Sequence, residues 1–374
     1  MKIVLDPQIF NDQKFGGISR YFAEIYKYIK TEDSANEIEL PLIFSENFHI
    51  KDLIENRHSL FYILSLKFPF FKKKYLRKTK KNNIKLAIKI LQKQDYDVVV
   101  PTYYNPYFID LIGNKPFVLT VYDMIHEVFP QYFVEDLYTV KNKKILIEKA
   151  NKIIAISEST KKDIIKFYPD IDATKIEIIY LAQSIDTINS VKVDLPKKYI
   201  LFVGNRGIYK NFIFFIKSIA STLRENRDLF VICAGGNHLH SKEKKLLEEL
   251  DIFKQVIQQN FEDNELSYYY SNAQCFVFPS EYEGFGIPVL ESMACGCAVV
   301  LANHSSFPEV AGDAGVYFEL NNELDLKNKI VLLLNDESYR TQIIQKGYQQ
   351  VAKFSWKKTA QECLALFEKT VKEC

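Results

Sequence analysis

The sequence predicts an α/β protein with two domains. The chain has 374 residues, which is more than a single hydrophobic core usually organises. Short apolar runs, typical of buried parallel strands, alternate with helical patterns through the first half of the chain, and the same alternation starts again near residue 199. Of all residues, 47% are apolar, which is enough to bury two cores.

The composition excludes several classes of function. The formal net charge is only +2, which argues against a nucleic-acid binder. The six cysteines form no C-x-x-C pair and mostly lie in apolar runs, so we expect buried thiols in a reducing compartment rather than disulfides or a zinc site. The chain starts like a strand, not like a signal peptide, and no apolar run reaches the length of a membrane span. We therefore expect a cytoplasmic location.

The most informative stretch is FVFPSEYEGFGIPVLESMACGCAVVLA at residues 276–302. An apolar strand is followed by a turn with two glycines, and Pro288 then stands where a helix begins, which suits its fixed φ. Amide groups at a helix start beside the end of a parallel strand bind anions readily. Two carboxylates flank this point, Glu283 before the helix and Glu291 one turn into it. This pattern indicates a nucleotide site.

The same stretch resembles the retaining glycosyltransferases of family four. Their signature is a glutamate, seven residues and a second glutamate, here Glu283-GFGIPVL-Glu291, and the flanking PSEYEGFG, SMACGCAVV and SSFPEVAGDAG also match. The resemblance implies the GT-B fold, an α/β architecture in which two Rossmann-like domains face a cleft. We accordingly expect an acceptor-binding domain at 1–190, a nucleotide-sugar-binding domain at 191–355, and a helix at 356–374 that crosses back to the first domain.

The resemblance also implies the donor site. Lys210, in the segment GNRGIYKNF, matches the family's phosphate-binding lysine, and Arg206 matches a second cation less closely. Glu291 would accept hydrogen bonds from the ribose hydroxyls, and Glu283 would lie near the donor sugar and help to stabilise its positive charge in the transition state. The other expected donor-binding residues are Gly17, Gly204, Phe261, Gly284, Phe285, Gly286, Ile287, Pro288 and Val289.

The expected acceptor residues are in the first half of the chain. Tyr103 and Tyr104 follow a predicted strand, where ligands of α/β proteins collect. The segment Asp123-Met-Ile-His126-Glu resembles a family stretch that faces the cleft, with Tyr122 in place of the family's first histidine. We assign Asp123 and His126 to catalysis and the two tyrosines to the acceptor. A purely structural role in the loop is the alternative for His126.

No D-x-D motif follows a strand end, so the sequence predicts neither a metal nor a cofactor. Fixed cations and helix amides would instead stabilise the leaving diphosphate while the acceptor attacks from the same face. Two other functions stay open at this point. One is a GT-B-like sugar-nucleotide epimerase. The other is an inactive nucleotide-sugar-binding partner, which Tyr122 suggests because the family's histidine is missing there.

The stretch at 58–94 has a separate character. It holds eleven lysines and arginines without a single acid, and aromatic residues crowd ahead of the cations. Aromatic rings beside clustered cations are typical of segments that lie on anionic membranes. We predict peripheral binding at the inner face of the cell membrane, which would suit a lipid-linked rather than a free glycan acceptor. A solvated basic helix is the alternative.

Overall fold

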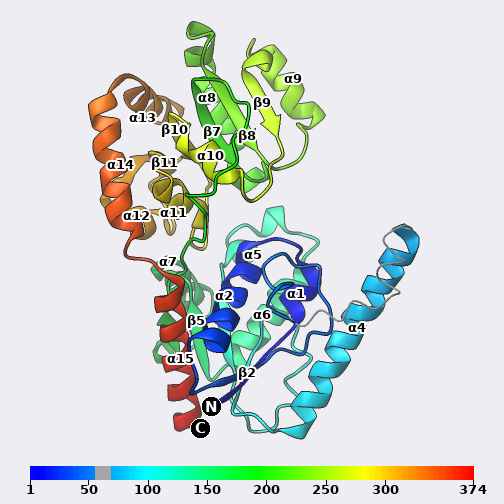
Figure 1. The fold of residues 1–374 in the computed structure, drawn as a ribbon. Coiled ribbons are helices and arrows are strands. Elements are labelled where there is room, and N and C mark those ends of the chain that lie inside the picture. The colour runs from blue at the N-terminus through cyan, green and yellow to red at the C-terminus, as the bar shows by residue number, and fades with distance from the viewer. Residues whose placement is uncertain (55–68) are drawn as a thin grey trace. The chain divides into compact units, whose positions relative to one another are not determined.

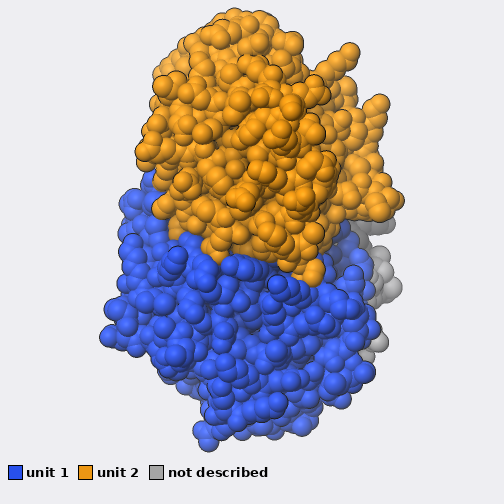
Figure 2. Space-filling model, turned by 90° about the vertical axis from the view of Figure 1, so that its left-hand side faces the viewer, with its two compact units in different colours: residues 1–181, 356–374 blue, residues 182–355 orange. Residues whose placement is uncertain are grey.

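A computed structural model describes residues 1–54 and 69–374. The chain forms two compact units, coloured separately in Figure 2: Met1–Leu181 together with Trp356–Cys374, and Ala182–Ser355. The sequence prediction had set the first boundary at residue 190. The aromatic first part of the 58–94 stretch, up to residue 68, lies outside the described residues.

Unit 1 contains two parallel sheets of three strands each. Their orders are β2-β1-β3 and β4-β5-β6, and a parallel bridge between Val99 and Phe117 links the two sheets. The strands β1, β3, β4 and β5 are mostly apolar and buried, as expected for parallel sheets. Their bounds are β1 Lys2–Leu5, β2 Glu37–Glu39, β3 Val98–Val100, β4 Val118–Val121, β5 Lys152–Ala155 and β6 Ile176–Ile178.

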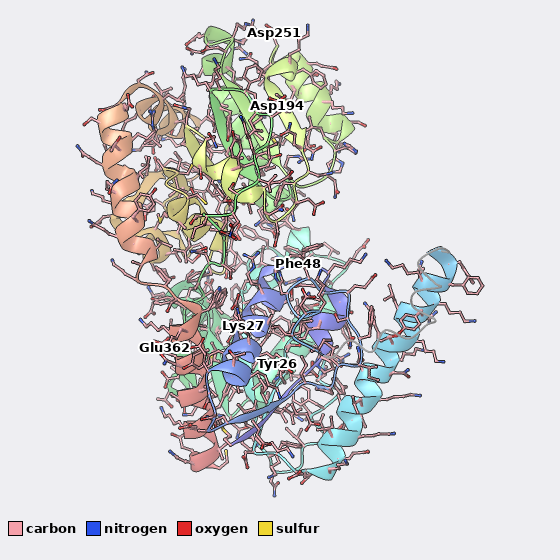
Figure 3. The ribbon with its side chains drawn as sticks, viewed as in Figure 1. Tyr26, Lys27, Phe48, Asp194, Asp251 and Glu362 are labelled. Atoms are coloured by element: carbon pink, nitrogen blue, oxygen red, sulfur yellow. The ribbon has the colours of Figure 1, made fainter. Side chains whose placement is uncertain are left out.

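The described helices of unit 1 include the last helix of the chain, α15, which returns to this unit after unit 2 (Figure 1). On α2, Tyr21 places its Oη atom 3.4 Å from the Cys363 Sγ atom of α15. On the same helix Tyr26 is buried and its neighbour Lys27 is exposed; both are labelled in Figure 3. The bounds are α1 Gln8–Asp12, α2 Gly17–Thr31, α4 Pro69–Lys93, α5 Ile125–Val128, η1 Pro130–Tyr132, α6 Leu137–Lys149, α7 Glu158–Phe167, η2 Ala173–Lys175 and α15 Trp356–Glu373.

Unit 2 is built on one parallel sheet of six strands in the order β12-β11-β10-β7-β8-β9. The chain enters at β7, in the middle, proceeds outward through β8 and β9, and returns to β10 on the other side of β7. Ligands of open α/β sheets bind at such a switch point, beyond the carboxyl ends of the two central strands. The bounds are β7 Tyr199–Val203, β8 Phe230–Ala234, β9 Val256–Gln259, β10 Cys275–Phe278, β11 Val299–Ala302 and β12 Gly315–Phe318.

Helices connect the strands of unit 2 and cover its sheet. They are η3 Ile208–Lys210, α8 Phe212–Glu225, α9 Ser241–Glu249, η4 Phe253–Gln255, α10 Leu266–Ser271, α11 Ile287–Ala294, α12 Phe307–Ala311, η5 Gly312–Ala314, α13 Glu323–Asn335 and α14 Glu337–Val351. The predicted α/β class is confirmed. Within residues 1–54 and 69–374, no helix is both long and apolar enough to cross a membrane.

Candidate active site

The two residues at the centre of the predicted donor site meet in unit 2. Lys210 follows β7 and Glu283 follows β10, and the Lys210 Nζ atom lies 2.6 Å from the Glu283 Oε1 atom. Both side chains are mostly buried. The ammonium also lies 5.0 Å from the ring centre of Tyr209 and 5.2 Å from that of Phe278, which adds cation–π attraction. The ion pair therefore stands at the switch point between β7 and β10.

Serine hydroxyls hold the turn that carries Glu283. The Ser305 Oγ atom donates a hydrogen bond to the Glu283 carbonyl at 2.6 Å, and the Ser306 Oγ atom donates to the Phe285 carbonyl at 2.9 Å. Gly286 has φ +95°, and a Cβ atom added there would lie 3.3 Å from a phenylalanine ring of α12. Only glycine adopts this backbone conformation readily. These contacts therefore hold the backbone of the turn that carries Glu283.

Glu291 lies one turn into α11 and is almost completely buried. The Tyr270 Oη atom donates to its Oε2 atom over a long 3.5 Å, and burial raises the pKa of that tyrosine. The expected role of Glu291 as an acceptor of ribose hydroxyls stays a prediction. The Val289 amide donates to the Gly286 carbonyl at 2.9 Å, so one of the amides expected to face the donor already has a partner in the first turn.

Arg206 forms hydrogen bonds that hold the loop after β8. Its side chain is 1% exposed, and its Nε atom donates to Glu243 at 2.9 Å. Its Nη2 atom lies 3.0 Å from each of the carbonyl oxygens of Asn237 and His238. These contacts occupy the guanidinium within the protein. The expected role of Arg206 at the diphosphate stays a prediction.

Two of the expected donor-binding residues, Phe261 and Gly204, follow strands β9 and β7 of the same unit. Phe261 follows β9, and its ring is 3.1 Å from where a Cβ atom at Gly235, after β8, would stand. Gly204 follows β7 with φ +100°, and within the described residues, apart from its two chain neighbours, no heavy atom lies within 4 Å of the position of an added Cβ. The backbone is thus open beside Gly204, so a ligand could approach it closely.

The expected acceptor residues all belong to unit 1, as does Gly17, the first residue of α2. The Tyr103 and Tyr104 rings are 4.8 Å apart, and burial raises the pKa of Tyr103 to about 12. Tyr122 is buried, and its Oη atom donates to the Thr102 carbonyl at 2.9 Å, so this residue has a structural role. Tyr103 and Tyr104 line a cavity of about 510 Å³ together with three lysines of α4, namely Lys80, Lys81 and Lys85.

Asp123 and His126 lie in the segment after β4. The Asp123 Oδ1 atom accepts a hydrogen bond from the Ile125 amide at 3.1 Å. The His126 Nε2 atom lies 3.2 Å from the Asp136 Oδ2 atom, and its Nδ1 atom is buried without a hydrogen-bond partner among the described residues. Burial opposes ionisation of Asp136, but hydrogen bonds from Thr139 and the contact with His126 lower its pKa overall.

Comparisons with known proteins match nearly the whole chain. A family model described as glycosyl transferases group 1 matches residues 184–350, and one described as glycosyltransferase family 4 matches residues 39–183. The chain belongs to glycosyltransferase family four. This glycosyltransferase also resembles a solved glycosyltransferase structure from Rickettsia africae, with a TM-score of 0.70 over 100% of this chain and 99% of that one at 19% identity. The expected GT-B fold is confirmed.

Two curated bacterial relatives match the glycosyltransferase over most of its length. The O-antigen chain mannosyltransferase B of Escherichia coli is 28% identical over 286 residues, which are 70% of this chain and 71% of that protein. The N-acetylgalactosamine-N,N'-diacetylbacillosaminyl-diphospho-undecaprenol 4-alpha-N-acetylgalactosaminyltransferase of Campylobacter jejuni is 27% identical over 308 residues, 80% of each chain.

Three supporting residues are not marked by any sequence motif: Ser305 and Ser306, which hold the turn after β10, and Glu243, the partner of Arg206. Their partners are distant in sequence, so no local pattern marks them. Among residues 1–54 and 69–374, no cluster of three His, Cys, Asp or Glu side chains could hold a metal ion.

Proposed function

We propose that this glycosyltransferase moves a hexosyl group from a nucleotide-diphosphate sugar to a glycan or lipid-linked acceptor, with retention of anomeric configuration. The observation that carries the proposal is the Lys210–Glu283 pair at the switch point of unit 2, within the Glu283/Glu291 motif. The relatives support it, since one is a mannosyltransferase of O-antigen chains and another acts on a diphospho-undecaprenol-linked sugar.

The chemistry follows from the charges at this site. In the structure the Lys210 ammonium and the Glu283 carboxylate form an ion pair. A donor diphosphate would attract the ammonium, which then stabilises the negative charge as the bond between the sugar C1 atom and the phosphate oxygen breaks. Glu283 would stabilise the positive charge on the sugar, and Glu291 would bind the ribose. The acceptor oxygen forms the new bond to C1 on the same face, and its proton passes to the leaving phosphate.

The donor is identified by a thermal-shift screen with GDP-, UDP-, dTDP- and ADP-sugars, because a ligand that binds the native state raises Tm by mass action. Incubation of the best donor with candidate acceptors, followed by NMR of the anomeric proton, then tests the reaction. We expect a glycoside with the anomeric configuration of the donor. An inverted product, an epimerised sugar nucleotide or binding without turnover would each contradict the proposal.

We expect transfer to be independent of divalent metal ions. Lys210 is a fixed cation beside Glu283 and supplies the positive potential that a metal would otherwise provide at the leaving group. Initial rates after dialysis against EDTA should stay within about twofold of the untreated rate. Loss of activity in EDTA that Mn²⁺ or Mg²⁺ restores would show that a metal takes part.

We also propose that α4 holds the enzyme peripherally at the cytoplasmic face of a membrane. The helix buries the stripe Thr79, Asn83, Ala87 and Leu91 against unit 1. Its exposed face is basic, and Phe70 and Phe71, near its first turn, are 76% and 57% exposed. Rings of this kind enter the headgroup region, while each cation near an anionic surface contributes about 1 kcal/mol. A lipid-linked acceptor would then be presented to unit 1 at the membrane.

Removing four exposed cations of α4 should weaken binding to anionic liposomes by about tenfold or more, and binding should fall with salt. The variant replaces Lys73, Lys74, Arg77 and Lys78 with glutamine, leaving Lys72 in its ion pair with Glu46. The matched control removes four exposed lysines from other helices of unit 1, namely Lys141, Lys144, Lys149 and Lys162. Co-sedimentation measures the binding. If both variants lost the same amount of binding, or if the protein bound neutral and anionic liposomes equally, α4 would be an ordinary solvated helix and the proposal would be wrong.

A further inference from the structure

We propose that Lys143, a residue of α6, is a positioning residue. It holds the Asp123 segment and Tyr104, which we expect at the acceptor site, in place. The inference rests on the proposed function. The Lys143 side chain is fully buried, which is rare for lysine. Its Nζ atom lies 2.8 Å from the Glu127 Oε2 atom and 3.1 Å from the Asp123 carbonyl oxygen, to which it donates. One ammonium therefore holds both ends of the segment that carries Asp123 and His126.

The same ammonium also contacts a residue of the cavity of about 510 Å³ that the two expected acceptor tyrosines line. It lies 5.4 Å from the ring centre of Tyr104, which lines that cavity. The Tyr104 Oη atom in turn accepts a hydrogen bond from the Tyr122 amide at 3.2 Å, at the end of β4. Lys143 thus connects the tyrosine wall to the Asp123 segment through direct contacts with both.

Stability alone does not explain this arrangement. Moving two charges from water into the protein interior costs about as much free energy as their attraction supplies. An apolar pair of similar size therefore often stabilises a core equally well. Here the pair is embedded in directed contacts, since the second Glu127 carboxylate oxygen accepts from the Tyr168 Oη atom at 3.2 Å. Because Lys143 is buried and neutralised by Glu127, it does not bind substrate itself. It acts through Asp123 and Tyr104, as a positioning residue.

The test removes both charges together. Lys143→Met alone leaves the Glu127 carboxylate buried without its cation, so this single variant is expected to lower Tm strongly. The double variant Lys143→Met/Glu127→Gln contains no buried charge at this site and keeps an oxygen for Tyr168, but loses the anchor on the Asp123 carbonyl. The control is Lys161→Met, because Lys161 makes a bond of the same kind, to the Ile176 carbonyl at 2.8 Å, elsewhere in unit 1.

We expect the double variant to fold, to bind the donor nucleotide with wild-type Kd and to hydrolyse the donor in water at the wild-type rate. Its kcat/KM for the acceptor should fall about tenfold to a hundredfold, the scale of a small misplacement of reacting groups. Lys161→Met should keep the wild-type acceptor kinetics. A folded double variant with wild-type acceptor kinetics, or an equal loss in Lys161→Met, would overturn the inference.

Hydrogen exchange provides a readout that does not depend on activity. Amides of residues 122–128 should exchange at least several-fold faster in the double variant than in the wild type or in Lys161→Met, since local opening sets these rates. If the wild-type protein transfers no sugar, the proposed function fails, while this measurement still tests the anchor. Unchanged exchange in a folded double variant would show that Lys143 does not hold the segment.

Discussion

Replacing Lys210 with alanine should lower kcat by about two to three orders of magnitude, the scale seen when a pre-organised charge-stabilising group is removed. The structure gives the reason, because Lys210 is the cation 2.6 Å from Glu283 at the switch point of unit 2. The donor Kd should change less than kcat, since the negative charge on the leaving phosphate grows as the bond breaks. Steady-state rates at saturating donor measure the effect.

The control for this variant is Lys217→Ala, which removes an exposed lysine from α8 in the same unit. Its kcat should be that of the wild type. Tm is measured for both variants, because Lys210→Ala also leaves Glu283 without this cation. The kcat of Lys210→Ala could fall only in proportion to the fraction of unfolded protein, or could equal that of the wild type. Either result would show that the lysine does not act on the leaving group.

Replacing Glu291 with alanine should weaken nucleotide binding by about one to two orders of magnitude, as expected for the loss of a charged hydrogen-bond acceptor. The carboxylate lies one turn into α11, the helix that follows the glycine turn of the Glu283/Glu291 motif, and the ribose hydroxyls would donate to it. Because the ribose is bound equally before and during transfer, kcat at saturating donor should change less than Kd.

Titration calorimetry with the preferred nucleotide measures this loss. Glu248→Ala is the matched control, since it removes an exposed glutamate from α9 in the same unit and should leave Kd unchanged. Wild-type Kd in a folded Glu291→Ala variant would remove Glu291 from the donor site. A loss of kcat much larger than the loss of affinity would instead assign it a role in the transition state.

The sequence by itself determined the features that depend on neighbouring residues. Alternating apolar runs and helical patterns were sufficient for the α/β class, since buried strands and amphipathic helices leave distinct periods in a chain. At the start of α7, the Ser157 side chain accepts a hydrogen bond from the Thr160 amide, which is a cap between residues close in sequence. The glycine turn before α11 was readable too, because Gly286 has the positive φ that favours glycine.

The tertiary structure alone decided which distant residues meet. Lys210 and Glu283 are 73 residues apart, and they form an ion pair because the sheet places β7 beside β10. The sequence placed Arg206 among the expected donor-site cations, and only the fold shows that its side chain is buried against Glu243. Lys143 carried no local signal at all, because its role depends on contacts with Glu127 and with the Asp123 carbonyl that only the packed unit creates. Such pairings depend on strand order and packing, which a local pattern does not encode.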